Sequence, residues 1–157
     1  MISLLLRDLK RLPAAVHSHL ICTIATISTH ATDELSRNAY FKQLGDAIQG
    51  FFVGLVSKKL FMQNYQLTRM RESIVNCFEM FDGLALAMDE SNSTVIFEMC
   101  HVHFGSFTKL LDLYHNYADV QFYILLFFRD LLRNLVKQFL IRVRKQSQSS
   151  ITRGLPM

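Results

Sequence analysis

Residues 110–132 read LLDLYHNYADVQFYILLFFRDLL, with seven apolar residues unbroken from Phe122 to Phe128. Such a run could belong to a membrane span, a buried strand or a buried helix. A membrane-spanning helix needs about 18 or more predominantly apolar residues. Because Arg129 and Asp130 close the run after seven residues, it is too short to cross a membrane. We therefore expect no membrane insertion.

The apolar residues of this stretch follow the period of a helix rather than the two-residue period of a strand. One face carries Val120, Ile124, Phe127, Leu131 and Leu135. Three further residues widen that face well beyond a simple stripe: Tyr123, Leu126 and Phe128. The stretch therefore predicts a helix that its neighbours cover from more than one direction.

The composition points to the same class of fold. Half of the 157 residues are apolar and the mean hydropathy is +0.19, yet there are only six glycines and two prolines. Scarce turn residues favour a few long elements over many short strands. The sequence thus predicts an all-α fold, in one domain or in a few units of a repeat array.

The formal net charge is +4, and much of the excess lies at Arg142, Arg144, Lys145 and Arg153. A basic end of this kind is typical of a solvated helix terminus or tail, so we expect no nucleic-acid partner. The three cysteines are widely spaced. That spacing indicates free thiols in a reducing compartment rather than a disulfide framework.

Two more helices are predicted in the first third of the chain. The first follows Pro13, which the first turn of a helix tolerates. Its expected buried stripe is Val16, Leu20, Ile24 and Ile27. The second follows Asp33, and its expected stripe is Phe41, Leu44, Ile48, Phe51 and Leu55.

A third and a fourth helix are predicted in the middle of the chain. The third is expected to bury Leu67, Met70, Ile74, Phe78, Phe81 and Leu84. Gly83 lies inside it, and since glycine there costs about 1 kcal/mol against alanine, it predicts close packing or a kink. The fourth helix is expected to be capped by Ser93 or Thr94. Its predicted buried residues are Ile96, Cys100, Phe104, Phe107, Leu111 and Tyr114.

The helices also repeat along the chain. The first, third and fifth begin near Pro13, Leu67 and Asp119, a period of about fifty residues. This period predicts an α-solenoid of HEAT-type antiparallel helical hairpins, about two and a half repeats over residues 1–145, followed by a disordered polar tail at 146–157. Its open end faces would favour self-association. A four- or five-helix globular bundle is the structural alternative.

Three stretches resemble consecutive HEAT repeats of an exportin, a nuclear transport receptor of the importin-β (karyopherin) superfamily. They are LPAAVHSHLICTIATISTHATDELSRNAYFKQLGDAIQGFFVGL (12–55), RESIVNCFEMFDGLALAMDESNSTVIFE (71–98) and TKLLDLYHNYADVQFYILLFFRDLLRNL (108–135). The likeness covers roughly residues 12–140 and is one of pattern and order rather than of a catalytic motif.

The resemblance implies a function without covalent chemistry. Receptors of this superfamily are long superhelices that bind protein cargo and the GTP-bound form of Ran, contact nucleoporins and shuttle between nucleus and cytoplasm. The chain would then be a segment of such a receptor that adds a cargo-binding surface for Ran-GTP-dependent export. Ran would bind through the full-length receptor.

Few residues are spaced for chemistry. Glu98 and His101 have the ExxH spacing of di-iron helix bundles, but no matching pair is found on another helix. The histidine pairs at 17 and 19 and at 101 and 103 are two residues apart, so each pair points to different sides of a helix. No catalytic order of residues or phosphate-binding loop can be placed. We therefore expect no enzyme, no cofactor and no metal site.

Two polar stripes are the best candidates for partner binding. On the second helix the stripe is Asn38, Lys42, Asp46 and Gln49. On the fourth helix it is Glu98, His101, Thr108, Asp112 and His115. In HEAT hairpins the second helix of each pair lines the concave surface, so both stripes would face a partner. The alternatives are two solvated helix faces, a HEAT-type scaffold outside nuclear transport, or a helical-bundle metalloprotein built on Glu98 and His101.

Overall fold

The computed structural model describes residue 8 and residues 11–30 and 33–153. Within these ranges the secondary structure is entirely helical and contains no strand, which confirms the all-α part of the prediction. In chain order the helices are α2 (Ala14–Thr29), α3 (Glu34–Val56), α4 (Phe61–Asn64), α5 (Thr68–Leu86), α6 (Ser93–His101), α7 (Phe104–Leu113) and α8 (Ala118–Arg153).

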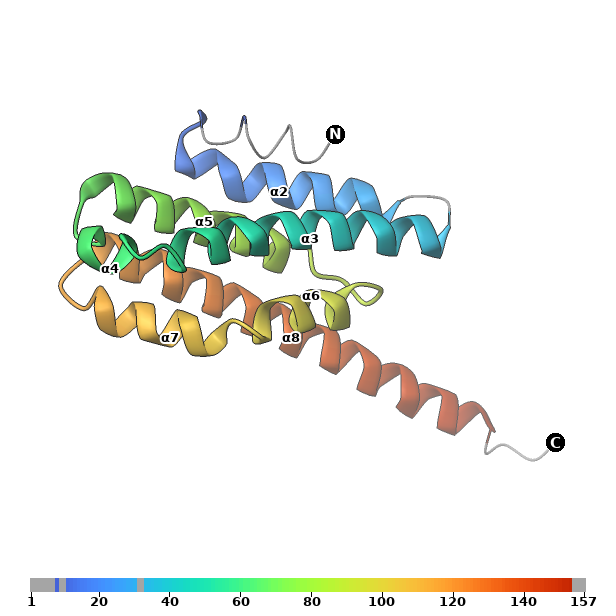
Figure 1. The fold of residues 1–157 in the computed structure, drawn as a ribbon. Helices are drawn as coiled ribbons and strands as arrows, with labels where there is room; N and C mark the ends of the chain where they lie inside the picture. The colour runs from blue at the N-terminus through green and yellow to red at the C-terminus, as the bar shows by residue number, and fades with distance from the viewer. Residues whose placement is uncertain (1–7, 9–10, 31–32, 154–157) are drawn as a thin grey trace.

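The helices form two layers (Figure 1). α2, α5 and α8 lie side by side in one layer and run in the same direction. α3 and the pair α6–α7 run in the opposite direction and form the second layer. α5 packs against α2 on one side and α8 on the other, and it also contacts α3 and α6. It is therefore the central helix.

The links between helices are held by local hydrogen bonds. Asp33 caps α3, since its Oδ1 accepts the backbone N–H of Ser36 at 2.7 Å. At the start of α6 the N-cap is Asn92, one residue before the predicted Ser93. The buried Asn92 side chain accepts the N–H of Asp89 at 2.8 Å and donates to the carbonyl of Ala87 at 3.1 Å. The side chain of Asn92 thus fixes the α5–α6 link instead of capping the helix that follows.

Two predicted elements differ from the structure. The predicted fourth helix is divided into α6 and α7 at Val102 and His103. At this break His103 Nε2 donates a hydrogen bond to Gln49 Oε1 on α3 at 2.9 Å. Gly105, which follows two residues later, is a weak helix former. Both features favour an interruption of the helix here. α8 continues to Arg153, past Gln146, where the composition predicts a disordered tail. A helix once formed extends at little cost, and the segment from 146 to 153 contains neither glycine nor proline. Residues 154–157 lie outside the described part.

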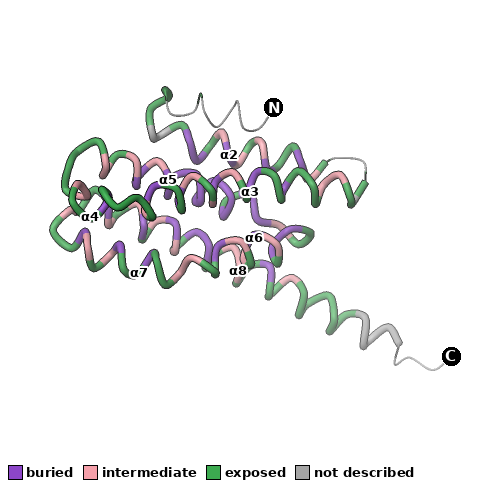
Figure 2. Tube along the Cα trace, in the orientation of Figure 1, coloured by how far each residue is buried: buried purple, intermediate pink, exposed green. Residues whose placement is uncertain are grey.

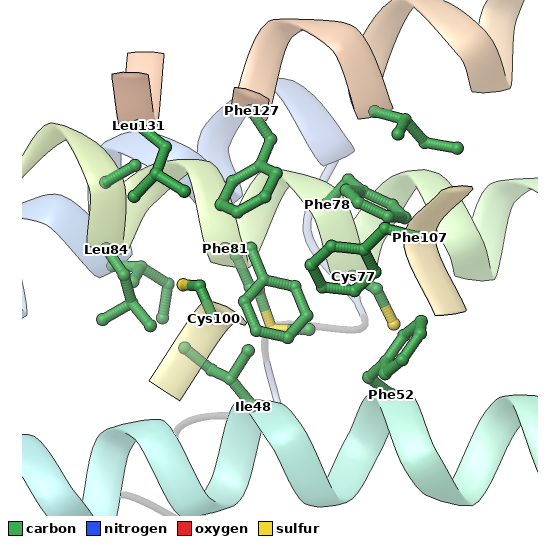
Figure 3. Close-up of a cluster of buried hydrophobic side chains, with 14 of the residues drawn as sticks. Ile48, Phe52, Cys77, Phe78, Phe81, Leu84, Cys100, Phe107, Phe127 and Leu131 are labelled. Atoms are coloured by element: carbon green, nitrogen blue, oxygen red, sulfur yellow. The ribbon is translucent and has the colours of Figure 1, made fainter. Parts of the chain in front are cut away.

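The core is built on a cluster of phenylalanine rings (Figure 3). The Phe107 ring lies 5.1 Å from Phe52, 4.9 Å from Phe78, 5.2 Å from Phe81 and 5.5 Å from Phe127, measured between centroids. All four contacts are edge-on, the arrangement that aromatic rings favour. These rings come from α3, α5, α7 and α8, so one cluster joins both layers.

α5 is buried around most of its circumference along its second half (Figure 2). Its contact with α2 brings the two backbones close together at Gly83. A Cβ added at Gly83 would meet the carbonyl oxygen of Ser18 at 2.5 Å and Cβ of Ile21 at 2.7 Å. This confirms that Gly83 marks close helix packing, because only a glycine lets the two backbones approach so far.

The predicted buried face of α2 is only partly correct, since Leu20 and Ile24 are half-buried and pack against the core but the other two residues are exposed. Ile27 is 67% exposed and Val16 is 42% exposed. The residues that α2 buries are instead His17, Ser18, Ile21, Ala25 and Ser28. Ser18 and Ile21 are the residues of this face that meet α5 at Gly83. On α8 the predicted face is correct, since Val120, Ile124, Phe127 and Leu131 are fully buried.

No helix in the ranges that the structure describes has both the length and the apolar content needed to span a bilayer. This finding agrees with the short apolar run at Phe122–Phe128.

Replacing Phe107 by alanine should lower the free energy of unfolding by about 3–5 kcal/mol, because the cavity would lie where four other rings converge. Phe122→Ala, at a side chain that is 58% exposed, serves as the control and should cost less than about 0.5 kcal/mol. Urea unfolding followed by circular dichroism measures both. Equal losses would contradict the central place of the Phe107 ring.

Two glycines give a matched pair for testing the α2–α5 contact. Gly83→Ala should destabilise the chain by about 1–3 kcal/mol, because the new methyl group would push α2 away from α5. Gly54→Ala, in α3, meets nothing within 4 Å and should stabilise it by about 0.5–1 kcal/mol through helix propensity. Thermal unfolding of both variants decides whether close approach at Gly83 is required.

Candidate functional site

The two predicted polar stripes lie on the second layer, on α3 and on α6 and α7. Gln49 and His103 join these elements through their 2.9 Å hydrogen bond. A Cβ at Gly45 would overlap the Sδ atom of Met99, so α3 and α6 also touch there. Burial lowers the pKa of His103, which therefore favours the neutral ring. A neutral imidazole with its proton on Nε2 suits the bond to the Gln49 oxygen.

On α3 the structure separates the four predicted residues into two groups. Asn38, Lys42 and Asp46 are exposed and make no hydrogen bond or ion pair with another described side chain. Gln49 is half-buried and holds His103. The first three are therefore available to a partner, whereas Gln49 stabilises the contact between helices.

The five predicted residues of α6 and α7 are all exposed. Three of them make local bonds to helix carbonyls: His101 Nδ1 to Glu98 at 3.0 Å, His115 Nδ1 to Asp112 at 2.9 Å, and Thr108 Oγ1 to Phe104 at 3.2 Å. The His101 ring also stacks on Phe97 with 5.4 Å between centroids. Such bonds satisfy the carbonyls near helix ends. The carboxylates of Glu98 and Asp112 remain available.

The nine residues are spread along the layer rather than gathered at one point. α3 begins at one end of the layer and α7 finishes at the other, beside α4 (Figure 1). The rings of Tyr65, after α4, and Tyr114, after α7, lie 5.6 Å apart. Among the described residues no three His, Cys, Asp or Glu side chains are placed to hold a metal ion. The arrangement offers charges of both signs over an extended surface, as in a polar protein contact.

A groove of about 570 Å³ lies between the end of α3 and the first half of α5. Leu55 and Met70 supply apolar lining, and Lys58, Arg69 and Glu72 supply charge of both signs. Sequence reasoning missed this groove because its lining comes from two helices and the link between them. The periodicity of residues along a single helix does not indicate such a groove.

A second missed feature is a buried acidic pair where α2, α5 and α8 meet. Asp82 and Asp130 are each about 4% exposed. Ser18 Oγ donates to Asp82 Oδ2 at 2.9 Å, and Arg129 donates to both oxygens of Asp130 at 2.9 and 2.8 Å. Burial raises the pKa of Asp82 to about 6, Ser18 partly opposes this, and the nearby Asp130 charge raises it further. Asp82 therefore holds its proton more strongly than an ordinary aspartate does.

The chain matches no protein-family model, no curated protein and no solved structure. The exportin resemblance of the sequence therefore stays a prediction.

Asp82→Asn tests the buried acid. Because the pKa of Asp82 is about 6 in the folded chain and 3.8 in an ordinary environment, the folded chain keeps a proton that the unfolded chain releases between about pH 4 and 6. Stability should therefore fall as pH rises through that window. Asparagine stays neutral, so the variant should be more stable than the parent by about 1–2 kcal/mol at about pH 7.5 and nearly equal at about pH 4.

Urea unfolding at the two pH values measures the difference. Asp112→Asn, at an exposed position, is the matched control and should change stability little at either pH. A constant difference for Asp82→Asn across the pH range would contradict the raised pKa.

Proposed function

We propose that the chain is a protein-binding scaffold of stacked helical hairpins, and that it acts without covalent chemistry as a segment of a nuclear transport receptor resembling exportin-4. Its role is to present the polar surface of α3, α6 and α7 to a folded protein cargo. In this proposal Ran-GTP acts through the whole receptor and favours the curvature that holds cargo for export.

The observation that carries the proposal is the repeat of the layered arrangement. α2, α5 and α8 begin at Ala14, Thr68 and Ala118 and run in parallel, while α3 and α6–α7 return between them. Each of these helices contacts mainly its neighbours in the stack. This is the arrangement expected of HEAT-type hairpins, which flex because each unit touches only the next. A globular bundle would close its last helix back onto its first.

The character of the second layer also supports binding rather than catalysis. Lys42, Asp46, Glu98 and Asp112 are exposed and place charges of both signs on α3, α6 and α7. A surface of this kind holds a polar partner by several modest contacts. The three stretches that resemble exportin HEAT repeats span both layers, and they make a transport receptor the specific form of scaffold that we propose.

The experiment is a charge reversal on α3 in the receptor that contains this chain. The cargo is captured in the presence of Ran that is loaded with a non-hydrolysable GTP analogue. Under this condition the double variant Lys42→Glu and Asp46→Lys should retain about tenfold less cargo than the parent, because its surface contacts with cargo would turn repulsive. Ran retention itself should not change. Pull-down from nuclear extract with quantitative mass spectrometry measures both.

Lys59→Glu, at an exposed residue outside the layer's polar stripes, is the control and should retain cargo normally. Cargo retained equally with and without Ran-GTP would support a HEAT-type scaffold outside nuclear transport instead. Unchanged cargo in the α3 variant would exclude the polar surface as the contact.

A further inference from the structure

α8 has a second apolar face, on the side turned away from the core. Its residues recur at helical spacing and are each 41–64% exposed: Leu125, Leu132, Val136, Phe139, Leu140 and Val143. We call this set the outer stripe. At 1.5 Å per residue it extends about 27 Å, the length of one partner helix. The outer half of α8 is exposed where it runs beyond the other helices (Figure 2).

Basic residues follow one edge of the outer stripe. Arg133, Lys137 and Arg144 are exposed, lie on one side of α8 by their spacing, and form no ion pair with a described residue. We call these three the basic ridge. Between residues 125 and 148 the one acid is Asp130, which is buried and bound by Arg129. Among the described residues of α8 the ridge therefore has no free acidic neighbour, and the nearby Glu90 pairs with Lys145 instead.

A second copy of the chain that docks through its own α8 or α2 does not satisfy this surface. Pairing α8 with α8 would bring two basic ridges together, which costs energy. α2, which carries the exposed apolar residues Val16 and Ile27, contains neither aspartate nor glutamate. Either arrangement would cover apolar area while leaving the basic ridge unpaired.

The opposite edge of the outer stripe opens into a hollow of about 300 Å³ between α6 and α8. Phe97, Leu135 and Phe139 make its apolar lining. Gln138, 6% exposed, also lines it, and its Oε1 has no hydrogen-bond partner among the described residues. A buried acceptor of this kind favours an entering side chain that carries an N–H or O–H donor. Protein side chains offer such donors, whereas lipid acyl chains do not.

We propose that the outer face of α8 binds an amphipathic helix of a partner protein that carries acidic residues along one edge. The apolar side of that helix covers the outer stripe, its acidic edge pairs with the basic ridge, and one side chain enters the hollow at Gln138. This is the helix-on-groove mode of recognition, with charge setting the partner's orientation. The surface is separate from the polar layer of α3, α6 and α7, and its test uses neither cargo nor Ran. This proposal concerns the chain by itself, because in a longer stack of hairpins the next hairpin would cover the same face of α8.

Two synthetic peptides of about 20 residues, enough to span the stripe, test the proposal on the unmodified full chain. Both carry leucines at helical spacing. One has glutamates along one edge, and the other has lysines at the same positions. By fluorescence anisotropy the glutamate peptide should bind about tenfold more tightly at about 50 mM salt, and the preference should shrink at about 300 mM.

Variants locate the site. Arg133→Glu combined with Lys137→Glu should remove the preference for the glutamate peptide, while Lys109→Glu, an exposed lysine on α7, should leave it unchanged. Val136→Glu, in the outer stripe, should weaken both peptides. Circular dichroism confirms that each variant folds, and the peptide pair on the parent chain remains decisive if one does not.

Four results would overturn the proposal. They are equal binding of the two peptides, binding of neither, binding to phosphatidylserine vesicles but to neither peptide, and a stable dimer in sedimentation equilibrium that Val136→Glu dissociates. The third result would assign the surface to a membrane, and the fourth would assign it to a second copy of the chain.

Discussion

The need to cover α5 on nearly every side determines the rest of this fold. Its second half places Phe78 and Phe81 toward the second layer, where Phe107 meets both rings at about 5 Å. Its other sides pack against α2 and α8. A helix so enclosed gains most of its stability from its neighbours and little from its own propensity. The parallel layer of α2, α5 and α8 follows from that constraint.

The same enclosure explains why polar groups lie inside. Asp82 faces α2 through Ser18, and Asp130 on α8 lies close enough to raise the pKa of Asp82. Burying a carboxyl costs stability unless partners or a proton compensate it. Here the hydroxyl of Ser18, the guanidinium of Arg129 and the raised pKa each supply part of that compensation. The Ser18–Asp82 bond lies next to the close approach of α2 and α5 at Gly83.

Sequence periodicity identified the helices whose buried faces are large and apolar. The α8 face at Ile124 and Phe127 is such a case, since no other face of that segment competes with it inside the core. Periodicity was only partly right on α2, because the face that packs against α5 is centred on Ser18 and Ile21 rather than on Ile27. The candidate site was found only as separate stripes. The bond between Gln49 and His103 depends on which helices become neighbours, and the pattern on one helix does not contain that information.

The central position of α5 has a consequence during synthesis. α2 and α3 precede α5 on the ribosome, but α7 and α8 follow it, so the nascent chain carries Phe78 and Phe81 before Phe107 and Phe127 exist to cover them. Aromatic surface exposed in this way is what chaperones recognise and what causes aggregation of incomplete chains. The completed α8 therefore also ends a vulnerable stage in the life of the polypeptide.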